Sequence, residues 1–186
     1  MKLIASLLFA SSALLSTNLL AKTVSGVEVN DAIKINQQNL LLNGAGVRSK
    51  FFIDLYVGSL YVPVSTQDAN TIYDAPLTAI RLNITSGLIT ADKMRDAINE
   101  GFEHATDGNI APLEAQITQF MSLFNNEIKE GDQFTLVFDK AAGVTAYKND
   151  LAQATIAGDD FRLALMKIWL GDKPAQKSLK RAMLGE

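Results

Sequence analysis

The spacing of hydrophobic positions changes along this chain, from alternation in the first half to a period of three or four in the middle. Apolar pieces at Val24–Val29 and Leu40–Leu42 predict short strands separated by Asn and Gly turns. The run Val47–Val62 is long enough for one bent strand or two consecutive ones, and Gly58 within it indicates a bulge or a close approach of another backbone. Leu77–Ile84 alternates apolar and polar residues, which is typical of a half-buried strand.

The middle and the end of the chain carry a helical period. Thr90 suits a helix N-cap, and the apolar residues after it form one stripe, made of Met94, Ile98, Phe102 and Ala105. Pro112 predicts the start of a second helix. The Asp159-Asp160 pair is expected to cap a third, which runs to Leu170, and a short last helix is expected over Ala175–Met183.

The order of these elements predicts the fold class. Gln133–Phe138 and Val144–Tyr147 predict a hairpin, and Ala152–Ala157 one further strand. Strands, then helices, then a hairpin, then helices again predict an α+β fold with a largely antiparallel sheet. Because strands and helices do not alternate singly, a dinucleotide-binding βαβ fold is not expected.

The first 21 residues differ from everything that follows. Lys2 precedes the apolar segment Leu3–Leu15, and Ala21 is a small residue suited to cleavage before Lys22. We expect a signal peptide over residues 1–21, a single domain over residues 22–186 and a periplasmic or secreted protein. An uncleaved membrane anchor is the alternative. No later segment reaches the length of about 18 uninterrupted apolar residues that a membrane span needs, so none is expected after cleavage.

Charge and residue types argue against several functions. The chain has 17 Lys and Arg against 20 Asp and Glu and shows no basic stripe, so nucleic acid is not an expected partner. It has no Cys, which excludes disulfides, thiol catalysis and thiolate metal sites. The only histidine, His104, stands near the end of an amphipathic helix, where a surface or helix-dipole role is expected. Neither a metal site nor a cofactor is expected.

Arg48 is the strongest candidate for binding a ligand. It stands inside an apolar run, where an unpaired guanidinium is costly, so it must reach solvent, pair with a carboxylate or wait for an anion. In one extended strand, the even spacing of eight places Tyr56 on the same face. The planar donors of the arginine and the hydroxyl of the tyrosine suit a carboxylate or phenolate on an apolar body. Pairing with an acid at a sheet edge remains the alternative.

These residues also resemble a known family. GAGVR, followed by KFFIDLYVGSLYV, resembles the entry strands of the chalcone isomerase-like superfamily. NITSGLITADKMRDAINEGF resembles its strand, turn and helix, DQFTLVFDKAAGVTAYKND its hairpin, and FRLALMKIWLGDKPAQKSLKRAML its closing helices. The resemblance covers essentially the whole expected mature chain. It implies an antiparallel sheet packed by a helical layer, with a cleft between them.

The resemblance also implies roles for single residues. In plant enzymes of the family a phenolate attacks an unsaturated ketone and closes a ring, while a strand arginine holds the phenolate and a threonine and a tyrosine polarise the ketone through water. Arg48 matches that arginine, and Tyr56 stands in place of the threonine. Thr90 matches the tyrosine position, Ala97 replaces an asparagine, and Arg162 falls at a Ser or Thr position. Most of the ketone-side polar set is therefore changed.

The pairing of a strand arginine with a strand tyrosine resembles the fatty-acid-binding, non-catalytic branch of the family. We therefore expect periplasmic binding of a fatty acid or a similar amphipathic anion, with Arg48 and Tyr56 at the head group and Thr90 and Arg162 as further ligand-binding candidates. Two alternatives stay open. One is an isomerase, an intramolecular lyase acting on a chalcone-like phenolic substrate. The other is a structural or partner-binding module, for example one that serves an inner-membrane complex.

Overall fold

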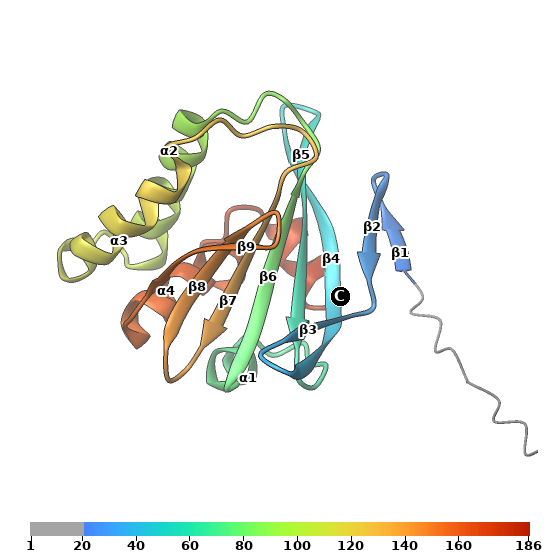
Figure 1. Cartoon of the computed structure of the whole chain (residues 1–186), viewed down its shortest axis with the longest axis horizontal. Coiled ribbons are helices and arrows are strands. Elements are labelled where there is room, and N and C mark those ends of the chain that lie inside the picture. Colours follow the sequence, from blue (N-terminus) through green and yellow to red (C-terminus); the bar gives the residue numbers. More distant parts are fainter. Residues whose placement is uncertain (1–20) are drawn as a thin grey trace, which may run out of the picture.

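The structure, a computed structural model, describes residues 21–186 and is built around one large antiparallel sheet. Seven strands lie in the sheet in their sequence order, each hydrogen-bonded to the next (Figure 1). They are β3 (Ala32–Ile35), β4 (Gln38–Lys50), β5 (Ile53–Val62), β6 (Leu77–Ile84), β7 (Gln133–Asp139), β8 (Gly143–Lys148) and β9 (Leu151–Ile156). Every pairing is antiparallel, so the prediction of an α+β fold with a largely antiparallel sheet is confirmed.

Helices cover one face of this sheet (Figure 1). They are α1 (Ala69–Asp74), α2 (Ala91–Ala105), the 3-10 turns Ala111–Leu113 and Ser122–Phe124, α3 (Glu114–Met121), α4 (Asp159–Leu170) and α5 (Lys177–Met183). Because side chains alternate across a strand, Leu60, Ile80 and Leu136 all point to the helical side and form the main core with the helices. Phe102 of α2 and Phe161 of α4 stack there with ring centroids 5.6 Å apart.

A smaller core lies on the opposite face. It contains Val57, Tyr61 and Val137, and the N-terminal hairpin of β1 (Ala21–Val24) and β2 (Val27–Asn30) contributes to it through Val29. Figure 1 shows this hairpin on the side of the sheet away from the helices. The expectation of one strand over Val24–Val29 is therefore wrong, since residues 25–26 form a turn inside it. Gly26 adopts a φ of 80°, a conformation that favours glycine.

The helix signals of the sequence are confirmed in part. Thr90 is the N-cap of α2, as predicted, and His104 lies exposed in the last turn of that helix. Pro112 lies in the 3-10 turn that leads into α3. The expected cap of α4 is wrong, because Gly158 occupies the N-cap position and neither aspartate of the Asp159-Asp160 pair makes a side-chain cap bond. Helix α1 and strand β3 had no counterpart in the sequence prediction.

The predicted signal peptide, residues 1–21, lies outside the described residues except for Ala21, the first residue of β1. Within residues 21–186, no helix is both long enough and apolar enough to cross a bilayer.

Candidate functional site

Strands β4 and β5 form a hairpin that places Arg48 beside Tyr56. The two residues are directly opposed across the antiparallel pair, so both face the helical side of the sheet. The expectation that Arg48 and Tyr56 lie in one extended strand is wrong, because residues 51–52 form a turn between β4 and β5. The expectation that the two side chains share a face is nevertheless confirmed, through cross-strand pairing in place of even spacing.

Tyr56 is buried, with 8% of its surface exposed. Its hydroxyl accepts a hydrogen bond of 3.0 Å from the indole Nε1 of Trp169, which α4 carries to this point. Burial raises the pKa of the Tyr56 hydroxyl above its usual 10.0, and the hydrogen bond from Trp169 and the positive charge of Arg48 oppose that rise only in part. The group is therefore a neutral phenol at physiological pH, whose proton is still available for donation to a ligand.

Arg48 is half-buried and its charge meets only neutral acceptors. One guanidinium nitrogen donates to the side-chain oxygen of Gln176 at 2.9 Å and to the carbonyl of Ser49 at 3.3 Å. None of the ion pairs found within residues 21–186 involves Arg48. The sequence left three possibilities for this guanidinium: solvent, a carboxylate of the protein or an anionic ligand. Within residues 21–186 it does not pair with a carboxylate.

Gln176 links the hairpin to the start of α5. Its Oε1 accepts from the guanidinium of Arg48 and from the backbone N–H of Ser49, the latter at 3.0 Å, while its Nε2 donates to the carbonyl of Val47 at 3.2 Å. The amide oxygen of Gln176 thus lies between the guanidinium of Arg48 and the N–H of Ser49. A negatively charged carboxylate oxygen would form stronger hydrogen bonds with these two donors than a neutral amide oxygen does. A ligand carboxylate that replaced this oxygen would meet donors already in position.

Three glycines allow α5 to lie close enough for that contact. A Cβ on Gly44 would lie 2.1 Å from the carbonyl oxygen of Ala182, and a Cβ on Gly46 would lie 2.6 Å from the Cβ of Ala182. A Cβ on Gly58 would lie 3.3 Å from Leu179. Gly58 pairs in register with Gly46, so the expected bulge is wrong, and the close neighbour of Gly58 is the side chain of Leu179 where another backbone was expected. The register shifts of this pair fall elsewhere, at Leu42/Gly44 and Arg48/Ser49.

Thr90 is exposed and serves α2 itself. Its hydroxyl accepts from the backbone N–H of Lys93 at 3.3 Å, which is the capping bond predicted from the sequence. No hydrogen bond or ion pair within residues 21–186 joins Thr90 to Arg48 or Tyr56, and its role toward a ligand stays a prediction.

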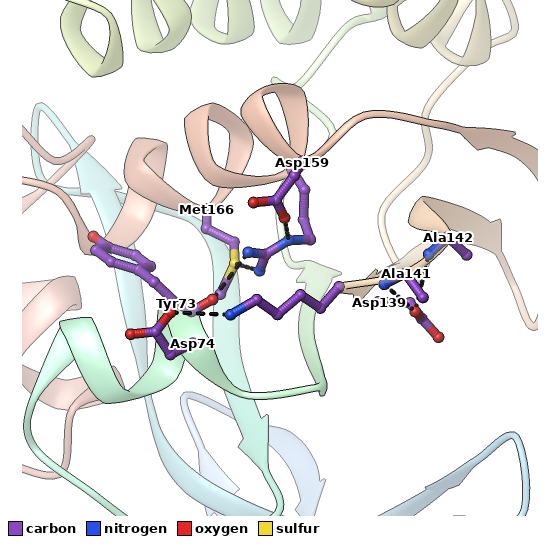
Figure 2. Close-up of polar contacts among 9 residues, drawn as sticks. Tyr73, Asp74, Asp139, Ala141, Ala142, Asp159 and Met166 are labelled. Carbon is purple, nitrogen blue, oxygen red and sulfur yellow. Dashed lines mark hydrogen bonds and ion pairs between the residues drawn. The ribbon is translucent and has the colours of Figure 1, made fainter.

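Arg162 is almost completely buried, with 1% of its surface exposed, and its nitrogens already have partners. They donate to the carboxylate of Asp159 at 2.6 Å, to the sulfur of Met166 at 3.4 Å and to the carbonyl of Tyr73 at 3.0 Å. Figure 2 shows Asp159 and Met166 on one helix and Tyr73 on another, drawn together by these bonds. Arg162 thus ties α4 to α1. No bond within the described residues brings it to Arg48 or Tyr56, and its ligand role also stays a prediction.

Two members of the arrangement were missed or left open by sequence reasoning. Trp169 is the only tryptophan of the chain, and a buried indole N–H needs an acceptor, so its type was a usable signal. Gln176 gave no signal, because its contact with Arg48 joins residues 128 positions apart.

Two cavities of about 480 Å³ each lie in the described part of the molecule, and neither includes Arg48 or Tyr56. One lies between the end of β5 and α1, where Val62, Thr66 and Ile72 contribute to its wall. The other lies where the ends of α2 and α4 meet α1, with His104 and Lys167 in its wall. Within residues 21–186, no group of three or more His, Cys, Asp or Glu side chains is arranged to hold a metal ion.

Comparison with known proteins identifies the class to which this fold and hairpin belong. The model of the chalcone isomerase-like family matches residues 21–185, so the chain belongs to that family, as the resemblance indicated. The fold is similar to the crystal structure of a fatty-acid binding protein from Arabidopsis thaliana, with a TM-score of 0.65 and 14% sequence identity. The match covers 89% of this chain and 95% of the plant protein. No curated protein matches the sequence.

Proposed function

We propose that this protein binds a fatty acid or a similar amphipathic anion without catalysing a reaction, and that Arg48 and Tyr56 receive the head group. The observation that carries the proposal is the guanidinium of Arg48, half-buried beside Tyr56 and held by a glutamine and a carbonyl, with no ion pair to it within residues 21–186. The fold shared with a fatty-acid binding protein of Arabidopsis supports the same class of ligand.

The apolar chain of the ligand has a natural place between the sheet and the helices. Tyr56 belongs to the main core, where Leu60, Ile84 and Trp169 surround the helical side of β5 and β6. Neither of the two cavities described above includes Arg48 or Tyr56. The side chain of Gln176 is the group to displace, because its oxygen holds the position between Arg48 and the N–H of Ser49.

A direct test is native mass spectrometry of the purified protein, followed by titration with oleate. Arg48→Ala removes a charge-assisted hydrogen bond worth about 1.5–3 kcal/mol, so oleate affinity should fall about tenfold to hundredfold. Arg181→Ala is the matched control, since it removes the same charge from an exposed position of α5. Equal affinity in the wild type and the Arg48 variant would exclude the proposed head-group site.

Gln176 offers a sharper test of the same geometry. Gln176→Glu places a carboxylate where the amide oxygen now meets Arg48, so it should act as a built-in competitor and weaken oleate binding. Gln176→Ala leaves the guanidinium open, so affinity should be retained or increased. Equal losses for both variants would show that Gln176 supports the fold and does not stand in for a ligand.

Two further outcomes separate this function from its alternatives. Turnover of a chalcone that disappears in Arg48→Ala would replace the binding proposal with the isomerase. The absence of any bound lipid, combined with no oleate binding, would favour a structural or partner-binding module.

We also propose that residues 1–21 direct export and are removed, so that the protein works in the periplasm or outside the cell. The apolar segment after Lys2 and the small Ala21 before the cleavage point support this. Cell fractionation and the measured mass of the processed chain test it: a protein that begins at Lys22 in the exported fraction is expected, and an intact N-terminus in the cytoplasm would contradict it.

A further inference from the structure

The turn that joins β4 to β5 exposes two aromatic side chains. Phe51 is 82% exposed and Phe52 is fully exposed, and the next residue, Ile53, is 43% exposed. Both phenylalanines adopt a left-handed backbone, with φ of 50° and 65°. A bulky side chain is disfavoured in that conformation, and an exposed ring gains nothing from the core. Neither local backbone preference nor packing therefore accounts for these two residues.

Other turns of the same kind in the described chain use different residues. Residues 25–26, 36–37 and 149–150 also join antiparallel strands, and both residues of each pair have positive φ. Their sequences are Ser-Gly, Asn-Gln and Asn-Asp, and each contains a Gly or an Asn, the residues that adopt a left-handed backbone most readily. Only Phe51–Phe52 departs from this pattern, which indicates a role for the two rings outside the fold itself.

The surroundings of the turn indicate what the rings would contact. The ammonium of Lys50 lies 5.8 Å from the centroid of the Phe51 ring, so a cation stands at the base of the apolar tip. The loop after β6 lies at the same end of the sheet as the turn (Figure 1), and it carries Leu88, which is half exposed. Exposed aromatic rings with a lysine that can reach back to the polar layer suit the interface of a lipid bilayer.

The position of the turn favours a lipid surface over a protein partner. Arg48 precedes Phe51 by three residues and Tyr56 follows Phe52 by four, so the tip and the proposed head-group site share one hairpin. A fatty acid partitions into membranes with its carboxylate at the interface. A tip that enters the interface would bring Arg48 to the depth at which that carboxylate lies. A protein partner would need a recess shaped for two protruding rings, whereas a bilayer deforms around them.

We propose that the tip formed by residues 50–53 docks on a lipid bilayer, with Phe51 and Phe52 inserted among the acyl chains and Lys50 at the head groups. The docking itself is independent of the ligand. The transfer of a fatty acid from the bilayer to Arg48 rests on the proposed function.

Flotation with phosphatidylcholine vesicles, with and without phosphatidylglycerol, tests the docking. The double variant Phe51→Asn/Phe52→Gly supplies the residues that this turn geometry favours, so it should keep or raise the midpoint of thermal unfolding. Because it removes both rings, its partitioning to vesicles should fall at least about tenfold. Val64→Ser removes a 75% exposed apolar side chain beyond the far end of β5 and should bind vesicles like the wild type. The processed N-terminus of each variant is checked by mass, so that a retained apolar leader does not cause flotation.

Two measurements make the proposals separable. Arg48→Ala should float with phosphatidylcholine vesicles like the wild type yet lose oleate affinity, whereas the turn variant should bind oleate at equilibrium yet receive it more slowly from donor vesicles. Wild-type protein that does not float would overturn the docking proposal. Equal flotation of the wild type and the turn variant would also overturn it. So would a dimer that forms without lipid, as seen by sedimentation, and that the turn variant does not form.

Discussion

At the scale of single residues, the candidate site is a chain of polar contacts that starts in the core and ends near the surface. The indole of Trp169 donates to Tyr56, Tyr56 lies across the hairpin from Arg48, and Arg48 donates to Gln176. All four side chains are buried or half-buried. Removing one of them by substitution therefore leaves its neighbour without a polar partner.

Tyr56→Phe tests the buried end of this chain. The substitution leaves the indole N–H of Trp169 without its acceptor in the core, and we expect it to lower the free energy of unfolding by about 1–3 kcal/mol. Urea unfolding followed by circular dichroism measures the change. Tyr147→Phe is the control, because Tyr147 is half-buried on the other face of the sheet and should cost much less. Equal stability of the two variants would show that the bond to Trp169 contributes nothing measurable.

The residues of this site were predictable to different degrees. Arg48 stood out because a guanidinium within an apolar run requires an explanation, and Tyr56 followed from its position in the same β-prone run. Gln176 could not be found, because its contact depends on how α5 packs on β4, and no local pattern encodes that approach. Thr90 and Arg162 were chosen from the family resemblance; in the structure Thr90 caps its own helix, and Arg162 bonds within α4 and to α1.

At the scale of elements, the hairpin and α5 act as one unit. The glycines of β4 remove side chains from the surface on which α5 lies, and α5 in turn begins next to Gln176. Most strands of the large sheet, the main helices and the fold class were predictable, because periods of two and of three to four are local properties of the sequence. The split of Val47–Val62 into two strands was harder to see, since Phe51–Phe52 carries none of the usual turn residues.

Gly44→Ala tests that contact. Its new Cβ would lie 2.1 Å from the carbonyl oxygen of Ala182, and because this atom belongs to the backbone, α5 itself must move. We expect a loss of roughly 1–3 kcal/mol in the free energy of unfolding, measured by urea titration. Gly87→Ala is the matched control, as a Cβ there meets nothing within 4 Å. Wild-type stability for Gly44→Ala would mean that the packing of α5 on β4 adapts without cost.

At the scale of the whole molecule, three tyrosines lie fully or partly buried in separate parts of the fold. Tyr56 lies on the helical side of the sheet and Tyr61 on the opposite side, while Tyr73 lies on α1. Burial raises the pKa of all three hydroxyls, and for Tyr73 burial together with the charge of Asp172 raises it to about 12. The neutral phenol is therefore favoured in the folded state, while the unfolded chain ionises near the ordinary value of 10.0.

The sign of the pH dependence follows from that difference. Below the unfolded pKa both states hold the phenol protons, and the stabilisation is fully present. As the pH rises above about 10 the unfolded state loses its protons first, so the free energy of unfolding falls, and for Tyr73 the fall continues to about pH 12.

Urea midpoints measured from about pH 8 to about pH 11 should therefore decrease with a slope that Tyr73→Phe reduces. This variant keeps the backbone carbonyl that accepts from Arg162, so the tie between α1 and α4 is preserved. An unchanged slope in Tyr73→Phe would show that the pKa of this phenol is the same in the folded and the unfolded protein, which would contradict the prediction.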